Sequence, residues 1–543
     1  ATLPLLQAAV DAVKADDWRT AGDLAIKALE IDEKSGVAWH VLGIAREKAG
    51  DFTTSLSCYE AALKLVEDDT DVANDLGRLA YRTGQKELAG KLFGYVLSRR
   101  PGDPDGANNL ACVLRDELRF SEAIDLLKPV IAANPESPLL WNTLGSILTE
   151  QGDPETAQTF FDEVLRLDPA HARARYNRGN VRMAVGDVDA ALKDVELALK
   201  LVTLEHERAM MNLARSTMLL ASGRIAEGWD AYEARLDPYF TDLLHYAVED
   251  APRWRPQDDL TGKVLLVFGE QGLGDEIMFA NMLRDAAAAV GPDGALLVAV
   301  EHRLVEMFRR ALPGAHVGAH RTYTVQGRSV RAAELPEGAP AADYWTPMGA
   351  LTRRFRTSVE AFPADPVYLP ADPARVARWK AELAELEGPM VGVLWKSLKI
   401  DSGRSRYFSP FDAWKPVLQT PGAAFVNLQY GDCSAELEAA AKAGLKLWTP
   451  PIDLKNDLDE VQALCAALDL VIGPPNATSN IAAAAGADVW MIAPPAAWTR
   501  LGAEGMPWYP TVRVFEPERL GRWSGVMKEV AAALSERVAS RGG

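Results

Sequence analysis

Residues 39–50, WHVLGIAREKAG, and residues 141–152, WNTLGSILTEQG, carry tryptophan, leucine and two glycines at matching positions. A leucine followed by a small residue recurs along this part of the chain with a period of 34 residues. The steps are Leu42-Gly43, Leu76-Gly77, Leu110-Ala111, Leu144-Gly145 and, with arginine in place of leucine, Arg178-Gly179. A fixed period of this length is typical of stacked helical hairpins. The sequence therefore predicts an α-solenoid over residues 1–235.

Other positions of the repeat explain how its helices pack. The small residue lets the two helices of a hairpin approach closely, and bulky residues such as Tyr59, Phe93 and Phe161 fill the space toward the next hairpin. A glycine in mid-repeat ends the first helix, and a proline begins the next repeat. This pattern resembles the tetratricopeptide repeat, which forms a superhelix with a concave groove for an extended peptide or a partner protein. The resemblance implies binding and, by itself, no chemistry.

Six asparagines lie just before the small-residue step, on the side of the first helix that lines the groove in this architecture. A side-chain amide there both donates to and accepts from the backbone of a bound segment, which holds a partner without reading its sequence. The alternative for each one is that it satisfies nearby backbone groups of its own helix. The groove residues that we predict are Asn74, Asn108, Asn109, Asn142, Asn177 and Asn212.

The composition limits the possible functions. A net charge of −18, from 58 Lys and Arg against 76 Asp and Glu, argues against nucleic acid as a partner, since such binding needs a basic surface. The apolar segments are shorter than the roughly 20 residues that cross a bilayer, so we expect no membrane span and a cytoplasmic location. The four cysteines lack the spacing of metal ligands, and we interpret them as reduced packing residues.

The second half of the chain has a different pattern, because the 34-residue period stops after Tyr232. Short apolar strands then alternate with helical segments, which predicts parallel sheets built from β-α-β units. We expect strands at 263–270, 294–300, 390–396, 424–429, 470–473 and 489–493. The predicted domains are a linker at 236–261 and two Rossmann-like lobes at 262–387 and 388–543, the second ending in a helix that crosses back at 523–538. Facing lobes of this kind bind ligands at the carboxyl ends of their strands.

The first lobe opens with a glycine-rich turn, GEQGLGDE, between a strand and a helix. Gly272 and Gly274 allow a tight turn and the close approach of a ligand, while Glu270 and Asp275 bring carboxylates to it. The turn lacks the third glycine of a dinucleotide fingerprint and the GK[ST] ending of a phosphate-binding loop. The two carboxylates are candidates for catalysis, and the alternative is that they cap the following helix.

The second lobe carries two polar segments at strand ends. One strand ends at Lys396 and leads into a basic loop with Arg404 and Arg406, which supply countercharge for a phosphate or else form a solvated surface. A later strand runs into a small-residue helix, whose free N–H groups and hydroxyls favour a phosphate. The residues at that helix start are Asn476, Thr478, Ser479 and Asn480. We interpret this part of the lobe as a nucleotide-sugar donor site, with simple helix capping by Thr478 and Ser479 as the alternative.

The segments GEQGLGDEIMFANML, VGVLWKS, FVNLQYG and LDEVQALCAALDLVIGPPNATSN resemble the tetratricopeptide-linked bacterial glycosyltransferases of the GT-B fold. That group is distantly related to the O-linked N-acetylglucosamine transferases and the heptosyltransferases. The likeness covers the whole chain when the repeats are counted. Within the group, this sequence is most similar to enzymes whose repeats hold flagellin and that attach pseudaminic acid, a sialic-acid-like sugar, from a CMP-activated donor.

The resemblance implies roles for individual residues. Relatives carry an acidic residue near the acceptor at this turn, which makes Asp275 the first candidate for the base and Glu270 the second. Gln429, in FVNLQYG, joins the donor site, and Glu460 is expected to reach the donor ribose. Many relatives have an Asp-Thr pair and a histidine at the late helix start, where this chain has Pro475, Asn476 and Asn480. This departure fits a donor with a single phosphate better than a uridine diphosphate donor.

Together these features predict an inverting protein O-glycosyltransferase that binds flagellin, or a similar protein, and transfers pseudaminic acid from CMP-pseudaminic acid to Ser or Thr. No metal or other cofactor is expected, since Asp457 and Asp459 precede an amphipathic helix and are interpreted as helix-start carboxylates. One alternative is an O-linked N-acetylglucosamine transferase-like enzyme that uses a UDP-sugar. Another is a scaffold or chaperone whose transferase half has lost its activity.

Overall fold

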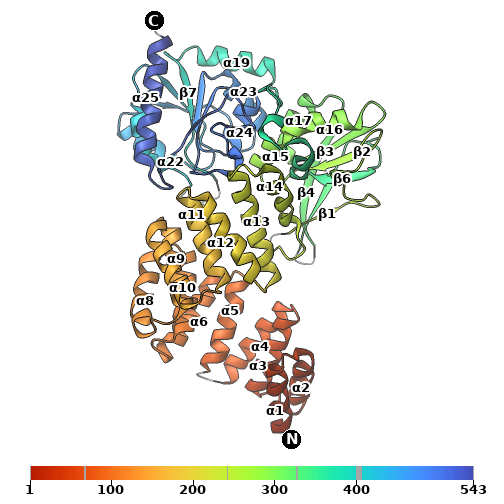
Figure 1. Cartoon of the computed structure of the whole chain (residues 1–543), viewed down its shortest axis with the longest axis vertical. Coiled ribbons are helices and arrows are strands. Elements are labelled where there is room, and N and C mark those ends of the chain that lie inside the picture. The colour runs from red at the N-terminus through yellow and green to blue at the C-terminus, as the bar shows by residue number, and fades with distance from the viewer. Residues whose placement is uncertain (1, 67–68, 241–242, 326–327, 399–406, 542–543) are drawn as a thin grey trace. The chain divides into compact units, whose positions relative to one another are not determined.

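The computed structural model describes residues 2–66, 69–240, 243–325, 328–398 and 407–541 (Figure 1). Two compact units, Ala1–Ala170 and His171–Gly543, divide the chain. The division falls inside the repeat array and not at its predicted end near residue 235.

The first unit is a stack of helical hairpins, as the 34-residue period predicts. Aspartates before the second helices accept hydrogen bonds from N–H groups three residues on, as Asp51 does from Thr54, and so begin those helices. Gly152 ends a first helix in the left-handed conformation, with φ of 94°. The helices are α1 (Thr2–Lys14), α2 (Trp18–Ile31), α3 (Gly36–Lys48), α4 (Phe52–Leu65), α5 (Thr70–Arg82), α6 (Lys86–Arg99), α7 (Pro104–Asp116), α8 (Phe120–Ala133), α9 (Pro138–Gln151) and α10 (Pro154–Leu167).

The small-residue step is packed as the sequence predicts. A Cβ atom added to Gly145 would lie 2.7 Å from the ring of Phe161, and one added to Gly77 would lie 2.7 Å from the ring of Phe93. Both rings are almost completely buried. The glycine and the aromatic ring therefore fit together within each hairpin, and neither can be enlarged without displacing the other.

The second unit begins with four more helices: α11 (Ala172–Ala184), α12 (Val188–Leu201), α13 (Glu205–Ala221) and α14 (Ile225–Tyr232), followed by the 3-10 helix η1 (Glu233–Leu236). Arg178 replaces the usual leucine and makes two hydrogen bonds, of 2.6 and 2.8 Å, to the buried carboxylate of Asp194. Arg182 also contacts Asp194, at 2.9 Å. An ion pair therefore stands where the other repeats have an apolar contact.

The first sheet has six strands in the order β1-β5-β4-β3-β2-β6. All neighbours are parallel except the β4–β5 hairpin, which is antiparallel and was not predicted. The predicted linker at 236–261 contains β1, which pairs with β5 from Leu244 to Ala247. The strands are β1 (Leu244–Ala247), β2 (Val264–Phe268), β3 (Ala295–Val300), β4 (His316–Val325), β5 (Arg328–Glu334) and β6 (Tyr344–Pro347).

The second sheet also has six strands, all parallel, in the order β12-β11-β10-β7-β8-β9. The last helix, α25 (Trp523–Arg541), packs on this same lobe through buried residues such as Met527 and Val530, next to α21 (Lys415–Leu418). The prediction that it crosses back to the first lobe is therefore wrong (Figure 1). The strands are β7 (Met390–Val393), β8 (Ala424–Asn427), β9 (Leu447–Trp448), β10 (Leu470–Gly473), β11 (Val489–Ile492) and β12 (Arg513–Phe515).

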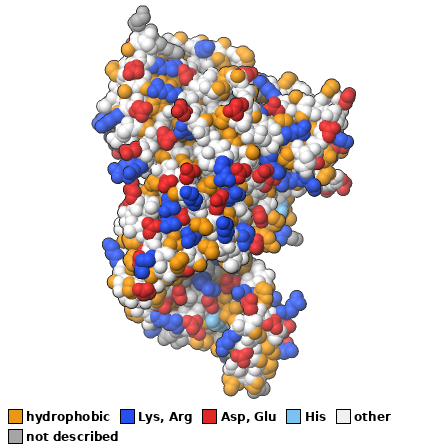
Figure 2. Space-filling model, in the orientation of Figure 1, with side chains coloured by type: hydrophobic (Ala, Val, Ile, Leu, Met, Phe, Trp, Pro, Cys, Tyr) orange, Lys and Arg blue, Asp and Glu red, His pale blue; other side chains and the backbone are white. Residues whose placement is uncertain are grey.

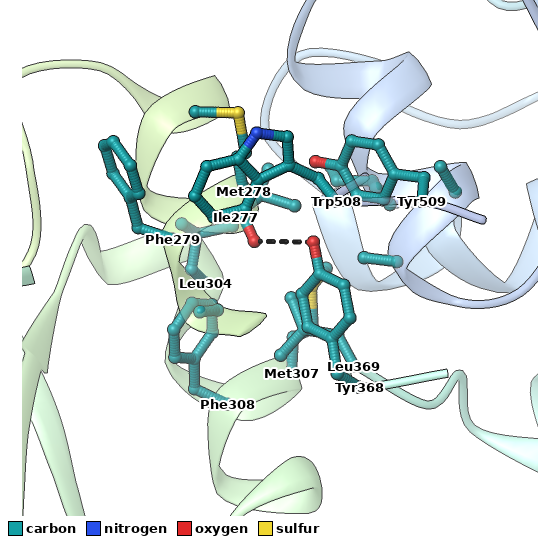
Figure 3. Close-up of a cluster of buried hydrophobic side chains, with 14 of the residues drawn as sticks. Ile277, Met278, Phe279, Leu304, Met307, Phe308, Tyr368, Leu369, Trp508 and Tyr509 are labelled. Atoms are coloured by element: carbon teal, nitrogen blue, oxygen red, sulfur yellow. Dashed lines mark hydrogen bonds between the residues drawn. The ribbon is translucent and has the colours of Figure 1, made fainter. Parts of the chain in front are cut away.

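The two lobes share one hydrophobic core. In Figure 3, Ile277 and Phe279 of α15 (Leu273–Phe279) face Trp508 and Tyr509 of the second lobe, and the Tyr368 hydroxyl donates to the Ile277 carbonyl oxygen at 3.1 Å. Helix α19 (Pro373–Leu383), which the predicted boundary assigned to the first lobe, packs against α23 (Leu458–Ala467) of the second. The chain therefore passes to the second lobe before residue 388.

Candidate functional site

The glycine-rich turn joins β2 to α15, as predicted. Glu270 is buried in this turn, and its Oε1 accepts hydrogen bonds from Arg235 Nη2 at 2.9 Å and from the Gly349 N–H at 2.6 Å. Its Oε2 lies 3.4 Å from Arg235 Nε. Glu270 therefore neither caps α15 nor faces an open cleft, because both of its oxygens are held in a buried ion pair. This contact pattern contradicts its place among the predicted catalytic residues.

Asp275 lies in the first turn of α15 and is half-buried. Its side chain folds back over the turn, since a Cβ atom added to Gly272 would lie 3.4 Å from Asp275 Oδ2. Burial raises the pKa of Tyr509 in the second lobe, and the negative charge of Asp275 adds to that effect. Asp275 is thus the carboxylate of the turn that lies near the second lobe.

The start of α24 (Ala477–Ala484) touches this turn directly. Asn480 Nδ2 donates to the Gly274 carbonyl oxygen at 3.0 Å, and a Cβ atom on Gly274 would lie 3.3 Å from the same nitrogen. Gly274 therefore provides the close approach that the sequence predicts for a glycine here, although the group that approaches is α24 of the second lobe. The structure brings the two predicted halves of the site into contact.

The other residues at the start of α24 are largely engaged with the backbone. Asn476 is the N-cap, and its Oδ1 accepts from the Ser479 N–H at 3.2 Å. Ser479 Oγ donates to the Pro474 carbonyl oxygen at 2.7 Å, and Ser479 and Thr478 are both buried. Asn476 Nδ2 is buried without a hydrogen-bond partner among the described residues. The cap of α24 is therefore Asn476 and not Ser479, whose hydroxyl donates to Pro474, and Asn476 Nδ2 is the amide group left without a partner in the described part of the chain.

Gln429 and Lys396 lie at the ends of β8 and β7. Gln429 Oε1 accepts from the N–H groups of Trp395 and Lys396, both at 2.9 Å, and its Nε2 donates to the carbonyl oxygens of Lys396 and Tyr430. Lys396 Nζ forms an ion pair with Glu436, a residue that the sequence analysis missed. Gln429 therefore fixes the strand ends, and Glu436 partly neutralises Lys396. Arg404 and Arg406 lie outside the described residues.

Glu460 does not face a donor site. Its carboxylate accepts from Arg375 Nη1 at 2.5 Å and from Trp379 Nε1 at 2.9 Å, and it also contacts Arg378. Burial by itself would raise the pKa of Glu460, but the hydrogen bonds from Arg378 and Trp379 and the charge of Arg375 outweigh that effect and lower the pKa. Glu460 therefore joins α23 to α19, which explains why the predicted ribose contact is wrong.

The neighbouring aspartates behave as helix-start carboxylates, as predicted. Asp457 is the N-cap of α23 and accepts from the Glu460 N–H at 3.3 Å. Asp459 pairs with Arg310 of α17 (Val305–Ala311) at 2.5 Å, which links the two lobes. Asp457 therefore caps α23, and Asp459 holds an ion pair across the lobes.

A buried pair that the sequence analysis missed lies behind the turn. Glu276 Oε1 is 2.8 Å from His320 Nε2 of β4, and Glu276 Oε2 accepts from the Glu301 N–H at 2.9 Å. Burial raises the pKa of Glu276, and the hydrogen bond from His320 opposes that shift. The two residues lie 44 positions apart on different elements, so no local sequence pattern indicates the pair.

Three of the predicted groove asparagines form part of a ladder of hydrogen bonds between the first helices of successive repeats. Asn109 Nδ2 donates to Asn74 Oδ1 at 3.2 Å, Asn108 Nδ2 donates to Asn109 Oδ1 at 3.2 Å, and Thr143 Oγ1 donates to Asn108 Oδ1 at 2.5 Å. The cross-repeat bonds join residues 35 positions apart, one more than the period. This spacing is the signal that could have predicted the ladder. Asn142 lies in the same unit, and Asn177 and Asn212 lie in the second unit, all three half-buried.

Charged residues beside this ladder are paired in the same way. His40 Nε2 lies 2.8 Å from Asp75 Oδ2, the Tyr81 hydroxyl donates to Asp116 at 2.7 Å, and Arg115 lies 3.3 Å from Glu150. These pairs also span 35 residues. Hydrogen bonds and ion pairs between repeats therefore engage the charged side chains nearest the amides.

Helical hairpins with a 34-residue period, joined to one mixed and one parallel six-stranded sheet, define a tetratricopeptide-repeat protein with an α/β second half. The tetratricopeptide repeat family matches residues 40–104, 108–172 and 142–204. The chain belongs to the family of protein FlbA of Caulobacter vibrioides, to which it is 51% identical over 538 residues, covering 98% of this chain and 90% of that protein.

More distant likenesses cover parts of the chain. Human protein O-mannosyl-transferase TMTC3 is 25% identical over 176 residues, which are 30% of this chain and 19% of that protein. A solved tetratricopeptide repeat protein from Parabacteroides merdae is 15% identical, with a TM-score of 0.38, and the match covers 43% of this chain and 92% of that one.

In the described part of the chain, each helix is too short or too polar to cross a membrane. The described part of the chain also contains no group of three or more His, Cys, Asp or Glu side chains placed to hold a metal ion.

Figure 2 shows positive and negative side chains interspersed over the face formed by α11–α13. Among the ion pairs of these helices, Arg173 pairs with Glu207 and Arg215 pairs with Glu196.

Proposed function

We propose that the protein transfers a sugar from a nucleotide-activated donor to a Ser or Thr hydroxyl of a partner protein that its repeats bind. The observation that carries this proposal is the contact between Gly274 and Asn480, which brings the Asp275 turn to the N-terminus of α24. A carboxylate at one side and a helix N-terminus at the other suit a reaction in which a hydroxyl loses a proton while a phosphate departs. The two six-stranded sheets support the GT-B assignment that the sequence implies.

The proposed chemistry uses few groups. Asp275 accepts the proton of the acceptor hydroxyl, whose oxygen forms a bond to the anomeric carbon of the sugar. The bond from that carbon to the phosphate oxygen breaks, and the nucleotide leaves with the electron pair. The free N–H groups of α24 and the unpartnered Asn476 Nδ2 stabilise the charge on the phosphate. Ser479 and Gln429 serve as supports for this site rather than as direct ligands.

For the donor we propose CMP-pseudaminic acid. The single phosphate of a CMP-sugar requires fewer contacts than a diphosphate. The start of α24 offers few side-chain donors, because Asn476 Nδ2 has no partner among the described residues but the Ser479 hydroxyl already donates to Pro474. Lys396, just after β7, supplies a positive charge, and its ion pair with Glu436 neutralises part of that charge. Arg404 and Arg406 are proposed to pair with the sugar carboxylate, as the resemblance implies. No metal takes part in the proposed reaction.

The proposed acceptor is flagellin or a protein like it, held in the repeat groove. The amide ladder from Asn74 to Thr143 offers donors and acceptors for the backbone of an extended segment, and the charged residues beside it are already paired. The human relative TMTC3, whose name describes protein O-mannosyl transfer, gives only weak support, because 19% of it is matched.

The test is intact-mass measurement after purified protein is mixed with flagellin and CMP-pseudaminic acid. A mass increase of one or more sugar residues on flagellin is expected, and Asp275→Asn should abolish it while leaving flagellin binding intact. A parallel reaction with UDP-N-acetylglucosamine examines the alternative donor. Transfer from the UDP-sugar alone would overturn the donor assignment but keep the reaction class.

A second candidate function is a protein-binding scaffold with an inactive α/β half. It is favoured by the contacts of Glu270, Glu460 and Ser479, which engage predicted site residues in structural roles. In this case flagellin binds the repeats, but no mass increase appears with any nucleotide sugar.

A further inference from the structure

The guanidinium of Arg235 is buried at the end of the helical array, and it is fully engaged. Arg235 lies on η1, and the Arg235 and Glu270 side chains are only 4% and 3% exposed. Besides its two contacts with Glu270, Arg235 donates to the Tyr232 carbonyl oxygen at 3.1 Å and lies 4.3 Å from the Tyr232 ring centroid. A buried guanidinium with a bidentate carboxylate partner holds both groups in one geometry.

The same carboxylate sits at the centre of a set of contacts that fix the glycine-rich turn. Arg331 of β5 donates to the carbonyl oxygens of Gly269 and Glu270 at 2.8 and 2.7 Å. The Gly349 N–H donates to Glu270, and a Cβ atom on Gly349 would lie 2.6 Å from Glu270 Oε1 and 3.0 Å from Arg235 Nη2. The turn is therefore held from η1, from β5 and from the backbone after β6.

Helix α14, just before η1, holds the other end of α15. Trp229 is buried, its Nε1 donates to the Arg356 carbonyl oxygen at 2.8 Å, and its ring meets that of Phe279 edge-on at 6.2 Å. Phe279 is the last residue of α15, five residues after Gly274 of the turn. The last helices of the array thus contact both ends of the element that carries Asp275.

A close backbone contact attaches the preceding turn as well. A Cβ atom on Gly502 would lie 2.7 Å from the Gly223 Cα atom, at the turn between α13 and α14. No side chain fits between these two segments. The turn of the α13–α14 hairpin is therefore in backbone contact with the α/β half.

We propose that Arg235 is a positioning residue of the active site, and that the end of the helical array sets the place of Asp275 through the Arg235–Glu270 ion pair. The inference rests on the proposed transferase function. In this proposal Glu270 supports the glycine-rich turn, and Asp275 takes part in the reaction. The last helical hairpin then belongs to the catalytic half. A displacement of about 1 Å at a reacting group lowers a rate by about a hundredfold, so loss of this anchor should act on turnover.

The experiment compares full-length Arg235→Met with the wild type in the flagellin transfer assay. Arg235→Met should lower kcat by about tenfold or more, with the KM for flagellin changed by less than about twofold, because the repeats that bind flagellin are untouched. Hydrogen exchange of residues 269–279 should become faster in the same variant. Unchanged kcat and unchanged exchange would overturn the inference.

Arg224→Met is the matched control. Arg224 precedes α14 of the same hairpin and pairs with Glu227 at 2.5 Å, but this pair is 43% and 55% exposed and involves neither Arg235 nor Glu270. Kinetics and exchange should stay within about twofold of the wild type, since exposed pairs contribute little. An effect on kcat equal to that of Arg235→Met would show that any loosening of the hairpin suffices, and would also overturn the specific role of Arg235.

Because Arg235→Met leaves Glu270 buried without a countercharge, a second variant keeps the test valid if the first fails to fold. Arg235→Met/Glu270→Gln removes both charges and keeps an acceptor for the Gly349 N–H. The double variant should regain thermal stability but not kcat. Recovery of both would mean that the pair serves stability alone. If the wild type transfers no sugar, the proposed function fails, and hydrogen exchange of 269–279 still decides whether Arg235 fixes the turn.

Discussion

Asn480 Nδ2 donates to the Gly274 carbonyl oxygen at 3.0 Å, and this bond joins the start of α24 to the first turn of α15. The residues lie 206 positions apart, on helices of different lobes. A close approach is possible because Gly274 has no side chain, and its Cβ atom would lie 3.3 Å from the donor nitrogen. The contact fixes the distance between the proposed base and the proposed phosphate site.

The first prediction concerns this contact. Asn480→Ala should destabilise the protein by about 1 kcal/mol, the net contribution of one hydrogen bond, and should lower kcat without changing flagellin affinity. Urea unfolding and transfer kinetics measure the two effects. Asn456→Ala is the control, since Asn456 bonds to Asp453 in an exposed loop. Equal losses in both variants would argue against a special role for Asn480.

The second prediction concerns Asp275. Asp275→Asn should lower kcat by about 10²- to 10⁴-fold, the usual contribution of general base catalysis, while the unfolding midpoint stays close to that of the wild type. Glu270→Gln should instead lower stability, because Glu270 holds the buried Arg235. Transfer by Asp275→Asn at the wild-type rate would remove Asp275 from the reaction.

The third prediction concerns the amide ladder. Asn109→Ala should weaken flagellin binding, because Asn109 joins Asn74 to Asn108 in the middle of the ladder. Binding should depend only weakly on salt, since the neighbouring charges are already paired. Isothermal titration at two salt concentrations tests both points. A steep salt dependence would indicate that charges, rather than amides, hold the partner.

The fourth prediction concerns the packing of the repeats. Gly145→Ala should destabilise the protein by about 1–3 kcal/mol, because the new methyl group would meet Phe161 at 2.7 Å. Gly94→Ala is a matched control within a helix of the same unit, where an added Cβ atom meets nothing within 4 Å. That change should stabilise the protein by about 0.5–1 kcal/mol. Thermal melts of the two variants should therefore shift in opposite directions.

The fifth prediction concerns pH. The folded state lowers the pKa of Glu460, so its ion pairs stabilise the protein fully above the unfolded pKa near 4.5 and lose that effect as the pH falls below it. Glu460→Gln should reduce the free energy of unfolding by about 1–3 kcal/mol at pH 7, and the difference should shrink below pH 4.5. Denaturant unfolding across this pH range measures the effect. A difference that grows at low pH would contradict the assignment.

Much of the fold could be predicted from the sequence because its signals are local. The repeat period located the hairpins, and runs such as VLLVF located the central strands. The β4–β5 hairpin and β1 were missed, since β1 is a short edge strand that depends on its pairing with β5. The helix α25 has a local helical pattern, but the face on which it packs is set by distant residues.

The contacts of the candidate site residues were harder to predict than the segments that carry them. The glycine turn and the start of α24 were identified correctly as segments that meet. Glu270 and Glu460 were misassigned because their partners, Arg235, Arg375 and Arg378, come from distant parts of the chain. A carboxylate at a strand end or helix start looks the same in sequence whether it is exposed or buried against an arginine.

The boundary at Ala170 and His171 has a practical meaning for protein engineering. A chimera that replaces helices α1–α10 exchanges a self-contained recognition module. A fusion made at the end of the repeat period, near residue 235, would cut through the packing of Trp229 and separate Arg235 from Glu270. Recombination between relatives should therefore tolerate crossover points before α11 far better than those after α14.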